Sequence, residues 1–180
     1  MKNLIIIEGL WNVGKTSFIK KFCSKFLYEF IEEPNHQKEG IKNNISDWYK
    51  IQHKFRLENA IHKISENKKI IMERSILSNF AYSYALEGNY SESLLSNFYN
   101  QVSYYNYIII YLTPESKSID ISKYIPKGIK PCIFKEKYSF FYKNILLEKK
   151  IDVVILESIF KSKYWYSENE FVKSIKYLIK

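Results

Sequence analysis

The chain has 180 residues and a mass of 21.6 kDa, with a formal net charge of +9. This length suits a single domain spanning residues 1–180, and a hydrophobic content of 46% excludes a disordered chain. Two isolated cysteines, Cys23 and Cys132, exclude a disulfide framework and a cysteine-rich zinc site. The apolar run Leu4–Ile7 is too short for a signal peptide or a membrane span, so we expect a soluble cytoplasmic protein with no membrane partner.

The basic excess favours an anionic partner, but its make-up argues against nucleic acid. Arg56 and Arg74 are the only arginines among 28 basic residues, and the others are lysines. Base recognition favours the bidentate arginine side chain, whereas lysine is also the ordinary solvated surface residue. We therefore expect most of the charge to reflect a lysine-biased surface, with a charge that attracts an anion as the alternative, and we do not expect a nucleic-acid partner.

Five short apolar runs without alternation predict strands that are buried on both faces of a parallel sheet. Helical patterns lie between them, and this alternation predicts a three-layer α/β domain with right-handed crossovers. The segment Pro114–Pro131 interrupts the alternation and is predicted to be a lid or an exposed connection. In chain order, the predicted elements are strand Leu4–Ile7, helix Thr16–Leu27, strand Tyr28–Ile31, helix Asp47–Glu66, strand Ile70–Met72, helix Ser91–Tyr105, strand Tyr107–Leu112, helix Phe134–Glu148, strand Val153–Leu156 and helix Glu168–Ile179.

The segment Gly9–Thr16 reads GLWNVGKT and satisfies the phosphate-loop pattern GxxxxGK[ST] between a predicted strand and helix. Glycines at both ends let backbone N–H groups converge on phosphate oxygens, and the helix N-terminus adds its dipole. Lys15 is expected to reach the β- and γ-phosphates, and Thr16 to bind Mg²⁺. The sequence therefore predicts a P-loop NTPase fold that binds ATP and Mg²⁺, with the nucleotide held by Gly9, Asn12, Val13, Gly14, Lys15, Thr16 and Ser17.

The rest of the chain narrows the class of P-loop protein. A switch GTPase would carry an N/TKxD base-reading motif, and the sequence has none. Motor and AAA-type ATPases need a Walker B strand, an arginine finger and usually a longer chain. Ile70–Glu73 could serve as a Walker B strand, but only Arg56 and Arg74 could supply the finger. The loop motif alone therefore leaves a kinase open, and the basic excess leaves a nucleic-acid-associated NTPase as an alternative.

The stretch Ile71–Tyr82 reads IMERSILSNFAY and resembles motifs of two related kinase families. Its Glu-Arg-Ser matches the ERS motif of deoxynucleoside kinases, and its Arg, Ser, Ala and Tyr match the DRYxxSxxAYQ motif of thymidylate kinases. Glu33–Pro34 is similar to the Glu-Pro of deoxynucleoside kinases, and Tyr111–Glu115 and Phe134–Lys137 resemble segments beside the lid. With its phosphate loop, the chain resembles this joined group over nearly its whole length.

The resemblance implies an ATP-dependent kinase acting on a nucleoside or a nucleoside monophosphate. Arg74 would stabilise the transferring phosphoryl group, Glu73 would bind Mg²⁺, and Glu33 would take the proton of a sugar 5′-hydroxyl. In both families the helix that here spans Asp47–Glu66 carries an arginine and aromatic residues facing the acceptor. The acceptor contacts that the resemblance and the helical spacing suggest are Trp48, Gln52, Phe55, Arg56, Asn79 and Tyr82, while core packing is the alternative role for the aromatic residues.

The chain also differs from both families. Trp11 stands in the loop where thymidylate kinases typically carry an acid, and the predicted lid holds no arginine. Lys123, Lys127 or Lys130 would have to replace the planar guanidinium with a point charge. A nucleotide-binding protein with weak or no kinase activity is therefore a second alternative. The resemblance also implies a homodimer as a possible assembly, and it leaves open whether the acceptor is a nucleoside or a monophosphate.

Overall fold

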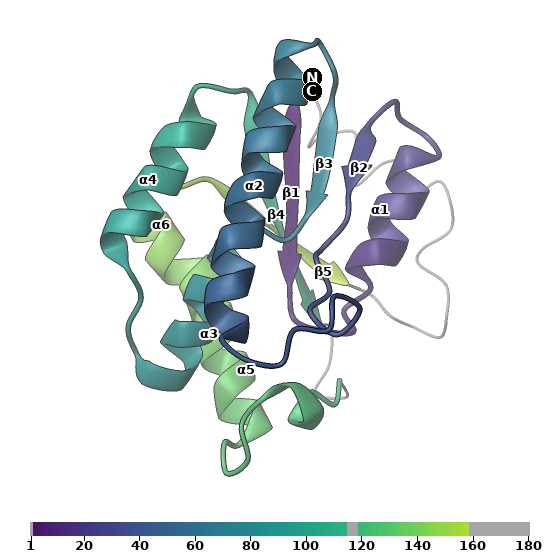
Figure 1. Ribbon diagram of the computed structural model, residues 1–180. Helices are drawn as coiled ribbons and strands as arrows, with labels where there is room; N and C mark the ends of the chain where they lie inside the picture. Colours follow the sequence, from purple (N-terminus) through teal and green to yellow (C-terminus); the bar gives the residue numbers. More distant parts are fainter. Residues whose placement is uncertain (1, 115–118, 159–180) are drawn as a thin grey trace.

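Isoleucine-rich runs without polar alternation form the centre of a parallel sheet. β1 (Leu4–Gly9) is buried along its whole length, as is β3 (Ile70–Glu73), because helices cover both faces. The sheet has five strands in the order β2-β3-β1-β4-β5, and all neighbours are parallel (Figure 1). The other strands are β2 (Glu29–Ile31), β4 (Tyr107–Pro114) and β5 (Val153–Ser158). The predicted five-stranded parallel α/β fold is confirmed.

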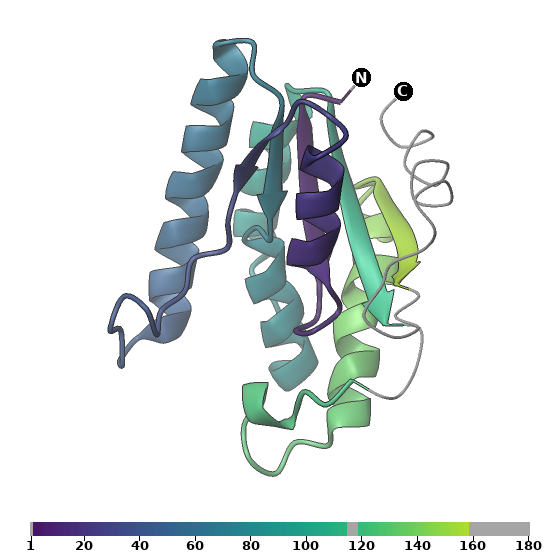
Figure 2. The ribbon, with the colours of Figure 1, turned by 90° about the vertical axis from the view of Figure 1, so that its right-hand side faces the viewer.

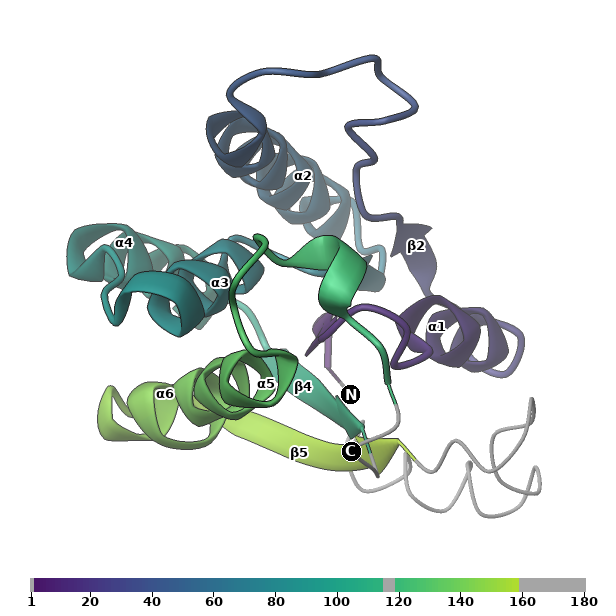
Figure 3. The ribbon, with the colours of Figure 1, turned by 90° about the horizontal axis from the view of Figure 1, so that it is seen from below.

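The computed structural model describes residues 2–114 and 119–158. α1 covers one face of the sheet, and α2, α3 and α5 lie over the other face (Figures 2 and 3). The helices are α1 (Lys15–Cys23), α2 (Ile45–Ser65), α3 (Leu77–Glu87), α4 (Glu92–Ser103), α5 (Pro131–Phe140) and α6 (Leu146–Glu148), with a 3₁₀ turn η1 (Ser122–Tyr124) and a π-helical turn η2 (Phe141–Ile145).

Three helices differ from the sequence prediction. α1 ends at Cys23, and Leu27, placed in the predicted helix, is 95% exposed. α3 has no predicted counterpart, because its sequence LSNFAYSYALE lacks a clear amphipathic pattern. The predicted helix from Phe134 begins earlier, at Pro131, whose fixed φ suits a first helical position. The predicted helix Glu168–Ile179 lies outside the described residues.

Because all five strands are parallel, their carboxyl ends meet at one edge of the sheet. Ligand sites in open α/β sheets form at this edge. The described part of the predicted lid, residues 119–130 (the lid segment), runs across the same edge and contains η1 (Figure 3). Among the described helices, none has the length and apolar character to cross a membrane.

Candidate active site at the carboxyl edge of the sheet

The chain curls between the end of β1 and the start of α1, where three residues adopt positive φ angles. Gly9 has φ 144°, and a Cβ atom there would lie 2.6 Å from the carbonyl oxygen of Leu112. Asn12 and Gly14 have φ angles of 61° and 82°, in the left-handed region. α1 starts directly afterwards at Lys15, so its unpaired backbone N–H groups open into the loop. This geometry is suited to binding an anion.

Lys15 lies inside this loop. Its side chain is 5% exposed, and Nζ donates a hydrogen bond of 2.9 Å to the carbonyl oxygen of Leu10. Burial, together with the positive charge of Arg74, lowers the pKa of Lys15 to about 7. An anion bound in the loop would favour the charged form of this amine.

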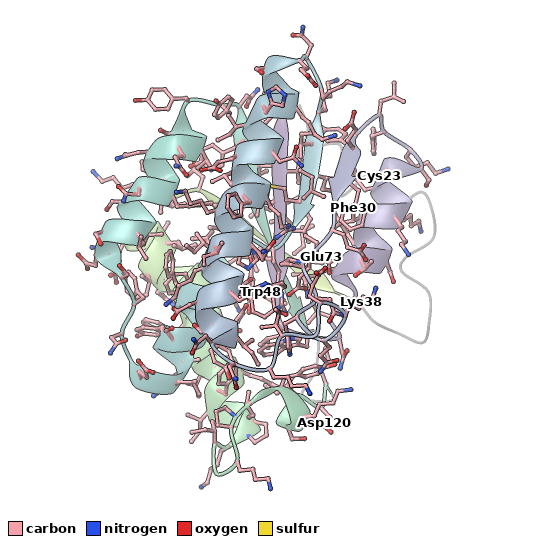
Figure 4. The ribbon with its side chains drawn as sticks, viewed as in Figure 1. Cys23, Phe30, Lys38, Trp48, Glu73 and Asp120 are labelled. Atoms are coloured by element: carbon pink, nitrogen blue, oxygen red, sulfur yellow. The ribbon has the colours of Figure 1, made fainter. Side chains whose placement is uncertain are left out.

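Thr16 and Glu73, the two predicted metal ligands, come together across the sheet edge. Glu73 lies at the end of β3 (Figure 4). Thr16 Oγ1 lies 2.9 and 3.0 Å from its two carboxylate oxygens. Burial raises the pKa of Glu73. Hydroxyl and carboxylate oxygens are the donors that Mg²⁺ prefers, and Mg²⁺ in kinases usually binds one or two side chains plus substrate phosphates. In residues 2–114 and 119–158 no group of three or more His, Cys, Asp or Glu side chains forms a separate metal site.

Arg74 directs its guanidinium into the same region. Nη1 donates to Glu33 Oε1 at 2.8 Å, and Nη2 donates to the carbonyl oxygen of Gly9 at 3.2 Å. The guanidinium lies over the indole ring of Trp11, 5.0 Å from its centroid. The structure thus brings Glu33 and Arg74, two of the predicted catalytic residues, into one ion pair beside the phosphate loop.

The resemblance suggested that Arg56 faces the acceptor, but Arg56 does not line the cavity. Its side chain is buried and donates to the carbonyl oxygens of Glu73, Ile31 and Arg74 at 2.6, 3.1 and 3.2 Å. Arg74 has φ 59°, an uncommon left-handed conformation for a non-glycine residue. Arg56 therefore braces the backbone turn that directs the side chains of Glu73 and Arg74.

Glu8, which directly follows the apolar run Leu4–Ile7, holds this turn from the other side. Its buried carboxylate accepts hydrogen bonds from Ser75 N and Ser75 Oγ at 2.8 and 2.6 Å. It also accepts from Ser78 Oγ at 2.5 Å and Tyr142 Oη at 3.0 Å. Burial raises its pKa, while these hydrogen bonds oppose the shift. A carboxylate inside a strand that is otherwise apolar was the sequence signal for this network.

A cavity of about 460 Å³ opens beside the Glu33–Arg74 pair. Asn79 and Tyr82, both predicted acceptor contacts, line it. Trp48, Gln52 and Phe55 are absent from its lining, and Phe55 is 58% exposed. The α2 residues that line the cavity are instead Ile45, Ser46, Tyr49 and His53, which lie on a different face of the helix from the predicted stripe. The remaining lining residues are Trp11, Glu33, His36, Gln37, Arg74, Ser78, Asn79, Tyr82, Lys123, Tyr124 and Tyr138.

The lid segment contacts the phosphate loop through aromatic rings. The Tyr124 ring stacks on Trp11 with centroids 5.0 Å apart and an interplanar angle of 4°. Lys123 lines the cavity, and its Nζ lies 4.9 Å from the Tyr124 ring centroid. Lys127 and Lys130, the other lysines expected to substitute for lid arginines, are exposed and outside the cavity lining.

Comparisons with known proteins support the fold. No protein-family model matches the chain, and no curated protein matches its sequence. Among solved structures, a thymidylate kinase from Ehrlichia chaffeensis is 16% identical, with a TM-score of 0.62 and 99% of each chain covered. A deoxyadenosine kinase from M. mycoides, solved with bound dATP, is 20% identical, with a TM-score of 0.55 and 99% of each chain covered.

A third solved structure is the YorR protein from Bacillus subtilis in complex with phosphorylated GDP. It is 16% identical, with a TM-score of 0.59, and the alignment covers 98% of this chain and 95% of that one. The strand order, the loop after β1 and these likenesses agree, and the chain has the fold of the P-loop nucleoside and nucleotide kinases.

Proposed function

We propose that this protein is an ATP-dependent kinase that phosphorylates the sugar 5′-hydroxyl of a nucleoside. The observation that carries the proposal is the 2.8 Å contact between Glu33 and Arg74, both of which line the cavity beside the phosphate loop. It places a carboxylate able to accept a proton next to a fixed positive charge able to stabilise a phosphoryl group. The kinase fold of the structural neighbours supports the same class of reaction.

In the proposed reaction, the loop amides and Lys15 hold the β- and γ-phosphates of ATP. Mg²⁺ bound by Thr16 and Glu73 would supply charge neutralisation at the phosphate oxygens. Glu33 accepts the proton of the acceptor hydroxyl group while the hydroxyl oxygen forms a bond to the γ-phosphorus. The bond between that phosphorus and the β–γ bridging oxygen breaks, and ADP leaves. Arg74 stabilises the negative charge on the phosphoryl group as it moves between the two oxygens.

The same pair favours a hydroxyl acceptor over a phosphate acceptor. A hydroxyl group is protonated at neutral pH and gains from a base, whereas a phosphate acceptor is already ionised. Glu33 would also repel an acceptor phosphate. A nucleoside monophosphate is the second candidate acceptor, favoured by Lys123 in the cavity wall.

An assay of ADP release with a panel of nucleosides and nucleoside monophosphates tests the proposal. We expect at least one nucleoside to stimulate ADP release, and Lys15→Ala to abolish it while the circular dichroism spectrum stays unchanged. Stimulation by monophosphates alone would favour the second candidate. If no acceptor stimulates ADP release, the protein is a nucleotide-binding protein without this kinase activity.

The nucleic-acid alternative needs its own test. Filter binding to DNA across a salt series is expected to show no retained complex near 0.15 M salt, because the proposed anion site is the loop between β1 and α1, where Lys15 is buried. Retention at that salt concentration, with DNA-stimulated ATP hydrolysis, would overturn the kinase proposal.

A further inference from the structure

His53 lies in the α2 wall of the cavity, and two contacts fix its ring. Its Nδ1 is 3.0 Å from Arg56 Nη1, and its ring stacks against Tyr49 with centroids 5.9 Å apart and an interplanar angle of 23°. The residue is 3% exposed. The orientation of the imidazole is therefore set before any ligand enters.

The contact with Arg56 also fixes which ring nitrogen carries the proton. A guanidinium has only donors, so Nδ1 must accept the hydrogen bond, and the proton of the neutral ring must lie on Nε2. Burial, followed by the charges of Arg56 and Arg74, lowers the pKa of His53 well below its usual range. The ring is therefore held neutral, in the Nε2–H form.

The contacts of the two ring nitrogens indicate which of them is left for a ligand. His53 belongs to the cavity lining and Arg56, which binds Nδ1, does not, so Nε2–H is the ring donor left for a ligand in the cavity. Among the described residues, the buried side-chain nitrogens and oxygens that lack a partner are Nε of Arg56 and Nε of Arg74, so His53 Nε2 is not sealed in the core. The cavity wall thus presents a hydrogen-bond donor that cannot switch to an acceptor without losing the Arg56 bond.

We propose that His53 determines base specificity, selecting a nucleoside whose base presents a carbonyl oxygen over the analogue with an amino group at that position. The inference rests on the proposed function, which places the sugar at Glu33 and leaves the base to extend along the Tyr49–His53 wall. A carbonyl oxygen accepts the Nε2–H hydrogen bond. An amino group would set donor against donor and leave a buried polar group unpaired.

Matched nucleoside pairs test the proposal, because inosine and adenosine, like uridine and cytidine, differ in an oxo against an amino group. We expect the wild-type protein to favour the oxo member of at least one pair about 10-fold or more, in both binding and kcat/KM. His53→Asn keeps an acceptor for Arg56 but is too short to present a donor to the cavity. The ratio of the affinities for the oxo and amino members should therefore fall towards 1. His62→Asn, on the exposed side of the same helix, should keep the preference.

A second variant and a spectroscopic readout keep the test independent of folding and turnover. His53→Gln presents an amide that can rotate to donate or accept, so it should bind both members of a pair with similar affinity. Long-range ¹H–¹⁵N spectra of the wild-type protein at pH 7 should show His53 protonated at Nε2 only, with the signal assigned by its absence in His53→Asn.

Equal affinity for both members of each pair, binding of no nucleoside, a preference that survives in His53→Asn, or a proton on Nδ1 would each overturn the inference. The two proposals fail separately. An oxo preference measured by NMR titration without ADP release would contradict the kinase proposal and leave the role of His53 intact. Phosphoryl transfer at equal rates to both members of each pair would support the kinase proposal and contradict the role of His53.

Discussion

Glu33 and Arg74 lie 41 positions apart in the sequence, yet their side chains meet at 2.8 Å beside the phosphate loop. The pair is poorly exposed, at 22% and 7% for the two side chains, so solvent screens it little. Arg74 holds the Glu33 carboxylate at the cavity wall, where the proposed reaction needs its general base.

Replacing Glu33 with Gln should reduce kcat for a nucleoside acceptor by about 10²- to 10⁴-fold, because the amide cannot accept the hydroxyl proton. ATP affinity should change little, since Glu33 lies on the acceptor side. Steady-state kinetics and ATP titration measure the two effects. Glu32→Gln is the matched control, because Glu32 is exposed and adjacent in sequence. Equal loss in both variants would exclude Glu33 as the base.

Arg56→Met should lower the free energy of unfolding by about 2 kcal/mol or more, because it leaves buried carbonyl oxygens without their donor. It should also lower kcat with little change in the KM for ATP, since the turn at Arg74 loses its brace. Arg56→Lys, which keeps one positive charge, should recover part of both. Urea denaturation and kinetics provide the measurements, with Lys54→Met on the exposed side of α2 as the control. If the free energy of unfolding falls as expected while kcat stays unchanged, Arg56 does not position Arg74.

ATP binding should take up protons above pH 7. The pKa of Lys15 is about 7 in the free protein, and bound phosphate favours the charged amine. ATP affinity should therefore fall as pH rises from 7 towards 10.5, while Lys15 contributes no pH dependence well below pH 7. Calorimetry at pH 8 in buffers of different ionisation enthalpy should detect uptake of up to one proton per ATP.

Two lysine variants check whether the proton uptake belongs to Lys15. Lys15→Met should remove the proton uptake, and Lys20→Met, exposed on the same helix, should retain it. Unfolding gives a sign test, because the unfolded lysine titrates near 10.5 and binds more protons than the folded one between pH 7 and 10.5. The contribution of Lys15 to stability should therefore rise with pH across this window. A wild-type protein that takes up no protons on binding ATP would contradict the assignment.

The Trp11–Tyr124 stack should couple the lid segment to the phosphate loop. In a double-mutant cycle of Trp11→Ala and Tyr124→Ala, we expect a coupling of about 0.5–1.5 kcal/mol in the free energy of unfolding. Urea denaturation of the four proteins measures it. A parallel cycle of Trp11→Ala with Tyr104→Ala, which removes a ring that is 87% exposed, should be additive. Additivity in the first cycle as well would show that the stack does not hold the lid segment.

Local patterns were enough to predict the sheet and the phosphate loop. Leu4–Ile7 in β1 and Tyr107–Leu112 in β4 are uninterrupted apolar runs, and the loop motif fixes several positions at a known spacing between a strand and a helix. The motif at Glu73–Arg74 was visible because Glu73 ends a buried strand and Arg74 follows it. In each case the determining residues are neighbours in the sequence, so no knowledge of tertiary packing was needed.

The orientation of α2 could not be predicted in this way. Apolar side chains occur all around this helix, and Ile51 and Phe55 remain more than half exposed while His53 and Arg56 are buried. A hydrophobic stripe therefore suggested a face of α2 that does not line the cavity. Arg56 is buried because carbonyl oxygens from β2 and from the turn after β3 converge on it, and that convergence exists only in the folded sheet.

The Glu8 network links chain segments that lie far apart in sequence. Tyr142, 134 positions after Glu8, belongs to the π-helical turn η2, while Ser75 and Ser78 flank the start of α3. Opening η2 would remove one donor from a buried carboxylate and weaken its hold on the backbone N–H of Ser75. The amide protons of η2 and of the first turn of α3 should therefore exchange with solvent as one cooperative unit, so the mobility of the Arg74 turn is set partly by a helix that does not contain it.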